Sequence, residues 1–213
     1  MSDAVSIAIG PRTVGDGHPC YVIAEAGSNH NRDLDIARRL IDAAVAAHAD
    51  AVKFQTFSGR ALYSSRAPRF DYLEGVSDKP PAELLEALEL PRDWQPLLAE
   101  HAREQGIEFL SSPFDRAAAD ELDALDVAAM KIASFELVDL PLISYIGAKR
   151  RPVILSTGMA TLGEIEEALD AARAGGATEL AILQCASLYP SPPSIMNLRS
   201  IATMKHAFGI PVG

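Results

Sequence analysis

Two lysines stand inside apolar segments of this 213-residue sequence, where a charged group needs a partner. Lys53 is flanked by valine and phenylalanine, and Lys131 by methionine and isoleucine. If both segments are strands, side chains alternate between the two faces, so each ammonium points into the interior of the protein. Because a buried ammonium is stable only beside a hydrogen-bonding or anionic partner, the pair predicts a bound anion or structural counterions.

Further polar side chains recur where the short apolar segments end. They are Glu25, Gln55, Ser111, Ser112, Ser134, Ser156, Thr157 and Gln184. The carboxyl ends of parallel strands meet at one mouth in barrel enzymes, so we expect these groups to converge there. Ammonium and hydroxyl donors can replace the hydration shell of a phosphate or carboxylate. The pattern therefore favours binding of a small anion.

Other interpretations of the same residues stay open from their chemistry alone. Glu25 could neutralise one lysine, with water or another carboxylate beside the other. Schiff-base catalysis by Lys53 or Lys131 requires a neutral amine, which the sequence does not exclude. His30, in the polar loop SNHN, is interpreted as a loop hydrogen-bonding residue, with metal ligand or proton carrier as alternatives. Cys185 is interpreted as a small core residue and not as a nucleophile.

The elements that must position these residues alternate along the chain. Six short apolar segments are separated by longer amphipathic ones, which is typical of strand and helix repeats with a parallel sheet. The predicted strands are residues 21–26, 50–56, 107–111, 128–132, 152–156 and 180–185, with a seventh beginning at Ile210. No glycine-rich phosphate loop follows the first strand, so a barrel is favoured over an open nucleotide-binding sheet. We expect one domain, residues 1–213.

The sequence also indicates where helices begin and end. Thr161 and Glu164 form a capping-box pattern before an apolar stripe that stops at a Gly-Gly pair, and Asp139 is interpreted as another helix start. Residues 58–81 lack clear periodicity and are interpreted as a long loop, either functional or a variable insertion.

The amino-acid composition indicates which kinds of binding partner are disfavoured. The formal net charge of -10 and a pI near 4.9 disfavour long-range attraction to nucleic acid or anionic lipid. No run approaches the roughly 20 apolar residues that cross a bilayer. The two cysteines lie far apart in the chain, which fits a reducing compartment. These features predict a cytoplasmic, soluble protein that acts on a small molecule.

Six motifs at successive strand ends carry a family resemblance. They are AEAGSNHN at 24–31, AVKFQT at 51–56, FLSSPFD at 109–115, KIASFE at 131–136, LSTGM at 155–159 and QCASLYP at 184–190. In order and spacing they resemble the sialic acid synthases, together with legionaminic and pseudaminic acid synthases and spore-coat polysaccharide synthases. The resemblance implies a TIM (β/α)8-type barrel. It also implies condensation of phosphoenolpyruvate with an N-acylated amino-hexose, such as N-acetylmannosamine or its phosphate, to a nonulosonic acid and phosphate.

The resemblance also implies roles for individual residues. Those that would form the phosphoenolpyruvate pocket are Lys53, Gln55, Ser112, Lys131, Ser134 and Ser156. Glu25 would contact the acceptor sugar, and Glu136 would handle a proton near a metal-bound water. Phe114, Ser187 and Tyr189 would line the acceptor side. Some family members have histidine in place of Gln184 and asparagine in place of Ser187, which bears on which sugar is accepted.

The resemblance further implies parts that lie beyond Gly213. These are the last strands, both metal-ligand histidines and a C-terminal antifreeze-like domain, so no metal ligand is expected within this chain. We expect an incomplete barrel of about six to seven strands, part of a longer protein that needs Mn²⁺ or Mg²⁺ and forms a homodimer. The alternatives are a Schiff-base aldolase using Lys53 or Lys131, and a noncatalytic sugar-phosphate-binding barrel.

Overall fold

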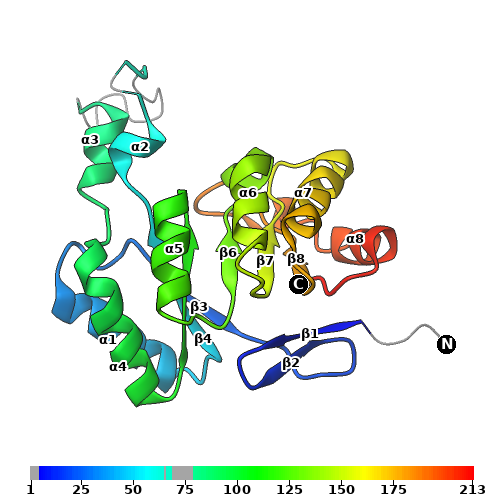
Figure 1. Ribbon diagram of the computed structural model, residues 1–213, viewed down its shortest axis with the longest axis horizontal. Coiled ribbons are helices and arrows are strands. Elements are labelled where there is room, and N and C mark those ends of the chain that lie inside the picture. The colour runs from blue at the N-terminus through cyan, green and yellow to red at the C-terminus, as the bar shows by residue number, and fades with distance from the viewer. Residues whose placement is uncertain (1–4, 65, 69–78) are drawn as a thin grey trace. The chain divides into compact units, whose positions relative to one another are not determined.

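The computed structural model describes residues 5–64, 66–68 and 79–213 (Figure 1). The chain divides into two compact units. One is Val22–Leu125, and the other combines Met1–Tyr21 with Asp126–Gly213. From Ile23 onward strands and helices alternate along the chain, as the sequence predicts.

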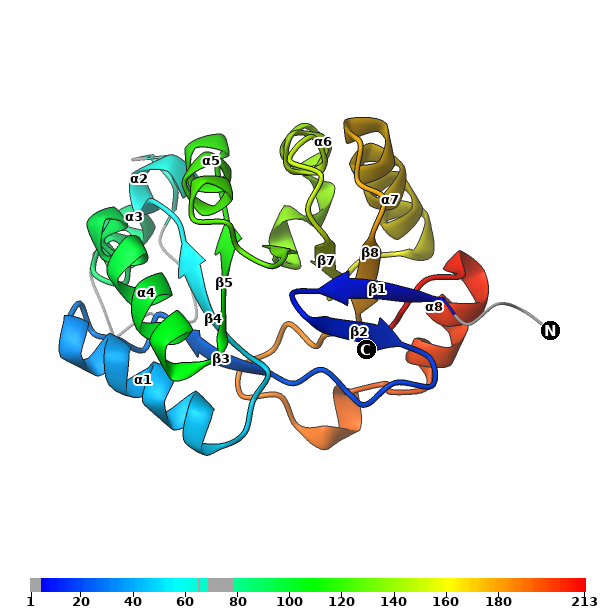
Figure 2. The same ribbon diagram turned by 60° about the horizontal axis from the view of Figure 1, so that its bottom comes forward.

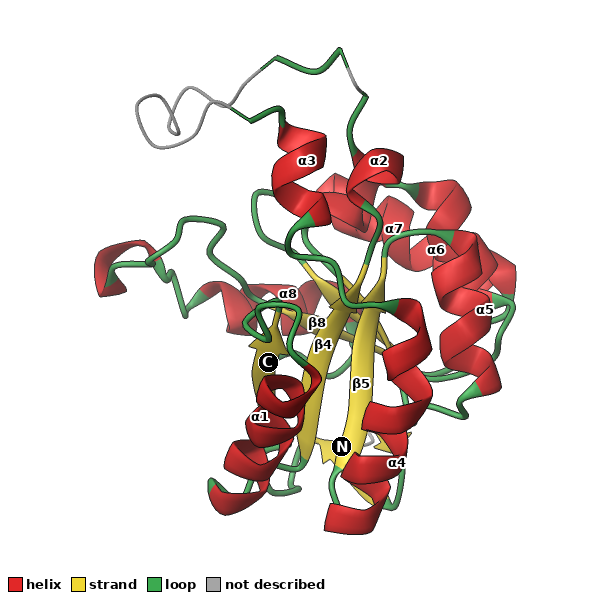
Figure 3. Ribbon diagram, turned by 90° about the vertical axis from the view of Figure 1, so that its left-hand side faces the viewer, coloured by secondary structure: helices red, strands yellow, loops and turns green. Residues whose placement is uncertain are grey.

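The Val22–Leu125 unit holds a parallel three-stranded sheet whose strands follow chain order, and Figure 3 shows β4 and β5 of this sheet side by side. Its strands are β3 (Ile23–Gly27), β4 (Ala51–Thr56) and β5 (Glu108–Pro113). Its helices are α1 (Leu34–Ala46), α2 (Gly59–Leu62), α3 (Pro81–Glu86), the 3-10 turn η2 (Arg92–Trp94), α4 (Gln95–Gln105) and α5 (Arg116–Ala124). Helices α1 and α4 pack against each other beside the sheet.

The core of this unit forms where α1 packs on β3 and β4 and α4 packs on β5. Ala37, Ile41 and Ala44 recur at helical spacing on α1 and are buried. Strand β4 is buried on both faces, as is usual for a parallel strand between helices and an interior. Phe54 is fully buried, and its ring stacks on that of Phe109 with 5.8 Å between centroids. This packing fixes the strand that carries Lys53.

The second unit contains another parallel sheet of three strands in chain order. The strands are β6 (Met130–Ile132), β7 (Val153–Ser156) and β8 (Leu180–Leu183). The helical elements are η3 (Phe135–Val138), α6 (Leu140–Gly147), α7 (Leu162–Gly175), η4 (Pro193–Ile195) and α8 (Ser200–Phe208). Helices α6 and α7 lie side by side (Figure 2).

The predicted strands and helix ends are confirmed, with shifts of one or two residues at most boundaries. The predicted seventh strand appears as a parallel bridge between Val212 and Ile182. Thr161 and Glu164 form the capping box, and Asp139 caps α6 by accepting from the amide of Leu142.

The first two strands were not predicted. A hairpin of β1 (Ser6–Ile9) and β2 (Arg12–Gly15) precedes the first barrel-type strand. Ile7 and Ile9 of this hairpin are buried, and the Ala8 amide donates to Glu179 at the start of β8.

The segment interpreted as a long loop, residues 58–81, begins with the short helix α2 and ends where α3 starts. Residues 65 and 69–78 of that segment lie outside the described residues. Among the residues that the structure describes, no helix has the length and apolar character needed to cross a membrane.

Candidate active site

Lys53 forms a close ion pair with Glu25 at the ends of neighbouring strands. The register of β3 and β4 sets the two residues opposite each other, and Lys53 Nζ lies 2.6 Å from Glu25 Oε2. The Lys53 side chain is 9% exposed and that of Glu25 is 52% exposed. The lysine is therefore buried, as predicted, and the interpretation that Glu25 neutralises one lysine is confirmed.

A β-bulge gives Glu25 room to make this pair. The register of β3 and β4 shifts between Glu25 and Gly27, and Gly27 has φ of +53°. A Cβ atom at position 27 would lie 3.2 Å from Glu25 Oε1. Glycine therefore suits position 27 for two reasons: it adopts the positive φ of the bulge, and it leaves room for the Glu25 carboxylate.

Gln55 and Ser112 lie opposite each other on the same side of the sheet as Lys53. The register of β4 and β5 pairs Gln55 with Ser112, one alternation beyond the lysine. Ser112 is 1% exposed, and its Oγ has no hydrogen-bond partner within the part of the chain that the structure describes. A buried hydroxyl without a hydrogen-bond partner destabilises the fold unless a ligand or water molecule forms a hydrogen bond with it. Phe114 follows two residues later, with its ring at the edge of Phe57.

Ser111 belongs to the opposite face of the same strand. Its Oγ lies 2.8 Å from the Oγ1 of Thr56, and both residues are fully buried. It was expected among the residues of the mouth, but strand alternation turns it away from Ser112 and toward the helices.

Lys131 is the buried ammonium of the other unit. Its Nζ donates to the carbonyl oxygen of Ile132 at 2.8 Å and to Ser156 Oγ at 2.5 Å. The thiol of Cys185 also lies 3.3 Å from Ser156 Oγ, in donor geometry. Because the Ser156 oxygen accepts from both neighbours, its own proton is left to be donated to a third partner. This arrangement suits an anionic ligand.

Ser134 and Ser187 close over Gly158, at the end of β7. The Gly158 amide donates to Ser134 Oγ at 3.1 Å. A Cβ atom at position 158 would lie 2.3 Å from Ser187 Oγ and 2.9 Å from Ser134 Oγ. Gly158 was not among the predicted site residues, although its place in the LSTGM motif at a strand end is a signal that could have revealed it.

Glu136 has a carboxyl group that can change protonation near neutral pH. Burial raises its pKa from 4.5 to about 7, and Asp139 adds to the rise, whereas its own backbone amide and Lys131 oppose it. Its Oε2 atom is buried and has no hydrogen-bond partner among the described residues. A carboxyl group with this pKa can both accept and return a proton at pH 7.

An open groove of about 600 Å³ lies beside these residues within the same unit. Its lining comes from the segments after β7 and β8: Thr157, Met159, Ala160, Gln184, Cys185, Ala186, Ser187, Leu188, Ile195, Asn197 and Ser200. Gln184 donates to the Met196 carbonyl, which holds the segment after β8 in place. Tyr189 follows the lining residue Leu188 and is 85% exposed.

His30 is a buried loop residue. Its Nδ1 accepts from the Arg32 amide at 3.1 Å, which agrees with the loop hydrogen-bonding interpretation. Burial, followed by the charge of Arg32, lowers its pKa. Among the described residues, no group of three or more His, Cys, Asp or Glu side chains could hold a metal ion.

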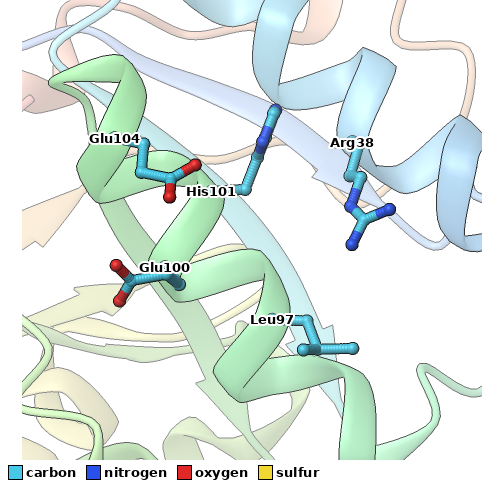
Figure 4. Close-up of a pocket in the computed structure, with 5 residues that line it drawn as sticks. All are labelled: Arg38, Leu97, Glu100, His101 and Glu104. Carbon is cyan, nitrogen blue, oxygen red and sulfur yellow. The ribbon is translucent and has the colours of Figure 1, made fainter.

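A second hollow lies on the outer faces of α1 and α4 (Figure 4). It is lined by Arg38, Leu97, Glu100, His101 and Glu104, and none of these was a predicted site residue. His101 is bonded there to Asp42 at 2.7 Å.

The predicted site residues fall into two groups. Glu25, Lys53, Gln55, Ser112 and Phe114 belong to the Val22–Leu125 unit, whereas the other unit carries Lys131, Ser134, Glu136, Ser156, Ser187 and Tyr189. The convergence of both groups on one mouth stays a prediction.

Parallel strands that are followed by helices and end in polar side chains define an α/β protein of the enzyme-barrel type. The model of the NeuB family matches residues 40–213, and the chain belongs to that family. The spore coat polysaccharide biosynthesis protein SpsE of Bacillus subtilis is 40% identical over 94% of this chain and 53% of its own length. The N,N'-diacetyllegionaminic acid synthase of Legionella pneumophila is 38% identical over 93% of this chain and 58% of its own.

A solved structure agrees in fold. The N-acetylneuraminic acid (sialic acid) synthetase of Leptospira borgpetersenii, crystallised with citrate, has a TM-score of 0.88 and 30% identity, covering 99% of this chain and 69% of that one. The fold class is thus α/β of the TIM-barrel type, present as part of a barrel. The chain spans little more than half the length of the curated relatives it matches.

Proposed function

We propose that the protein containing this chain condenses phosphoenolpyruvate with an N-acylated amino-hexose to give a nonulosonic acid and phosphate. The observation that carries the proposal is the cluster around Lys131, in which a buried ammonium and the hydroxyl of Ser156 stand near a carboxyl group of raised pKa. The reaction requires a group that binds the anionic donor and a group that transfers a proton, and this cluster contains one of each.

The residues of the chain would act by binding the donor and moving protons. The ammonium groups of Lys53 and Lys131 would hold the phosphate and carboxylate of phosphoenolpyruvate, with donated protons from Ser112 and Ser156. The methylene carbon of the donor attacks the acceptor aldehyde, water adds to the central carbon of the donor, and phosphate leaves. Glu136 in its carboxylate form would accept the proton of that water.

Acceptor binding is assigned to different residues. Glu25 would contact the sugar, and Phe114, Ser187 and Tyr189 would line its side of the site. Relatives of this chain include synthases named for legionaminic acid, pseudaminic acid and N-acetylneuraminate 9-phosphate. The acceptor is therefore proposed at the level of an N-acylated amino-hexose or its phosphate.

Mn²⁺ or Mg²⁺ is proposed as the cofactor on the strength of the family resemblance. Such a cation would polarise the carbonyl oxygen of the acceptor aldehyde. The described residues do not provide a ligand set for it, so the steps assigned to this chain are substrate binding and proton transfer only. A homodimer is proposed on the same resemblance, and a cytoplasmic location on the wide separation of the two cysteines in the chain.

The test is phosphate release by the complete, metal-loaded protein from phosphoenolpyruvate, with a panel of amino-sugar acceptors. Release that depends on both substrates supports the proposal. Borohydride trapping with substrate tests the Schiff-base alternative, because a trapped imine on Lys53 or Lys131 would replace the synthase mechanism. Binding of both substrates without turnover would indicate the noncatalytic barrel.

A further inference from the structure

A chain of hydrogen-bonded polar side chains runs behind the strand ends that carry Gln55 and Ser112. It crosses four elements, β4, β5, α4 and α5, and continues into η2. Its members are Thr56, Arg92, Gln95, Ser111, Asp115 and Glu121, and we call this set the Arg92 network. Thr56, Gln95 and Ser111 are 0 to 1% exposed.

The direction of each hydrogen bond in the Arg92 network follows from its charged end. Arg92 donates to Glu121 Oε2 at 2.9 Å and to Asp115 Oδ2 at 2.8 Å. The Glu121 carboxylate can only accept, so the Gln95 amide turns its Nε2 toward it at 2.9 Å. The Gln95 Oε1 atom then faces Thr56.

The remaining bonds are fixed in turn. Thr56 Oγ1 donates to Gln95 Oε1 at 3.3 Å, which leaves its oxygen to accept from Ser111 Oγ at 2.8 Å. The bonds therefore run in one direction from Ser111 through Thr56 and Gln95 to Glu121. The charge of Arg92 polarises the sequence of bonds from its far end.

The Arg92 network bonds Thr56 and Ser111, and the chain neighbours of these two residues, Gln55 and Ser112, belong to the proposed site. Ser111 directly precedes Ser112, and Thr56 directly follows Gln55, so fixing one face of each strand end fixes the other. The Phe114 amide donates to the Thr56 carbonyl at 3.1 Å. Asp115, the residue after Phe114, also caps α5 by accepting from the Ala118 amide. The turn that carries Phe114 is thereby bonded on both sides.

We propose that Arg92 and Gln95 are positioning residues that keep Gln55, Ser112 and Phe114 in the geometry that binds substrates. Apolar packing alone would let two parallel strands and a helix shift slightly, whereas directed hydrogen bonds allow one arrangement. This inference rests on the proposed function, because the geometry is the one in which the synthase would bind its substrates.

Kinetics of the complete protein test the inference. Gln95→Met removes both amide bonds at similar volume, and Thr56→Val removes the hydroxyl, whereas Thr56→Ser keeps it. We expect roughly a tenfold rise in KM for phosphoenolpyruvate in the first two variants, with kcat changed less than about threefold. Thr56→Ser should stay within about twofold of the parent. Glu100→Gln is the matched control, because Glu100 lies on α4 but is bonded to Arg103 at the surface.

Arg92→Lys is a milder second variant, at the partly exposed end of the network. It keeps the charge but cannot bridge two carboxylates with one planar group, so we expect a smaller rise in KM. A lower active fraction with unchanged KM in all these variants would show a merely structural role and overturn the inference.

Crystal structures of Gln95→Met and the parent separate this inference from the proposed function. Displaced Gln55 and Ser112 side chains in the variant would support the positioning role, even if the parent releases no phosphate from phosphoenolpyruvate. Unmoved side chains would overturn it, even if the parent is an active synthase.

Discussion

The two buried lysines differ in how their charge is accommodated. Lys53 touches the Glu25 carboxylate at 2.6 Å, and that carboxylate is half exposed to solvent. Lys131 donates to a hydroxyl and a carbonyl oxygen. It also lowers the pKa of Glu136, but burial outweighs this effect and the pKa reaches about 7. One lysine thus belongs to an ion pair, and the other stands near a carboxyl group that can exchange a proton.

This difference indicates that the ends of β4 and β6, which carry Lys53 and Lys131, have different roles in ligand binding. An ammonium already paired with a carboxylate gives a ligand a site of small net charge, so Lys53 and Glu25 together suit both donor and acceptor contacts. The Lys131 ammonium lies beside the Ser156 hydroxyl, so an anion bound there would contact an ammonium and a hydroxyl together. The proximity of Glu136 then links anion binding to proton transfer.

The largest expected effect is on donor binding. Lys131→Ala and Lys53→Ala should each weaken phosphoenolpyruvate binding by about 2 to 4 kcal/mol, as truncating one member of a buried charged pair does. In Lys53→Ala the Glu25 carboxylate is left behind, so adding Glu25→Gln should recover part of the loss. In Lys131→Ala, by contrast, adding Glu25→Gln should not recover donor binding, because Glu25 is the ion-pair partner of Lys53. Calorimetry on the complete protein measures both.

Lys205→Ala is the control for this comparison, because Lys205 is bonded to Asp16 at the surface. It should bind the donor as the parent does. Unchanged donor affinity in both Lys53→Ala and Lys131→Ala would remove the proposed anion pocket.

The second expected effect separates the two carboxyl groups by their kinetics. Glu136→Gln should lower turnover on the order of 100-fold or more while sparing donor binding, because the amide cannot accept a proton. Since the carboxylate is the active form, kcat of the parent should fall as the pH drops below about 7, the pKa of Glu136. Glu25→Gln should chiefly raise KM for the acceptor. Parent-like rate constants in both variants would contradict these roles.

Much of the fold could be predicted because each buried strand is a short apolar run bounded by turn residues. The hairpin of β1 and β2 was missed because neither strand is a continuous buried run: β1 buries only alternate side chains, Ile7 and Ile9, and β2 buries none fully. Its partner contact, from Ala8 to Glu179, joins residues 171 positions apart. No local pattern reports such a contact.

The types of residue at the candidate site could also be predicted, but not their environments. Lys53 and Lys131 are equivalent in the sequence, and only the strand register distinguishes the partner of each. The burial of Glu136 and the closure of Ser187 over Gly158 depend on how segments after different strands pack. The division into two compact units does not test the expectation of one domain.

The third expected effect concerns two glycines of the Lys131 unit. Gly158→Ala should lower kcat/KM by about tenfold, because the added Cβ displaces the hydroxyls of Ser134 and Ser187. Ser187→Ala in the same chain should restore part of the rate by removing the closest contact. Gly163→Ala is the control, because its Cβ would meet only Thr161 Oγ1 at 4.0 Å. Equal kcat/KM in the two single variants would mean that the closure over Gly158 is unimportant.

The smallest expected effect is on stability, and it again separates Glu136 from Glu25. A carboxyl group whose pKa rises from 4.5 to about 7 on folding is most compatible with the fold when protonated. The folded state therefore loses stability as the pH rises from about 4.5 to 7, and the loss is complete above 7. Glu136→Gln, which is always neutral, should unfold like the parent at pH 4 but be more stable at pH 8 by about 1 to 2 kcal/mol, after allowance for partial solvation. Glu25→Gln should show no such gain at pH 8, because it removes the partner of the buried Lys53 ammonium. Urea unfolding of the three proteins at both pH values provides the measurement. A Glu136→Gln variant that is less stable than the parent at pH 8 would mean that the carboxylate is favourably held in the fold, and the contrast between the two lysine environments would then be lost.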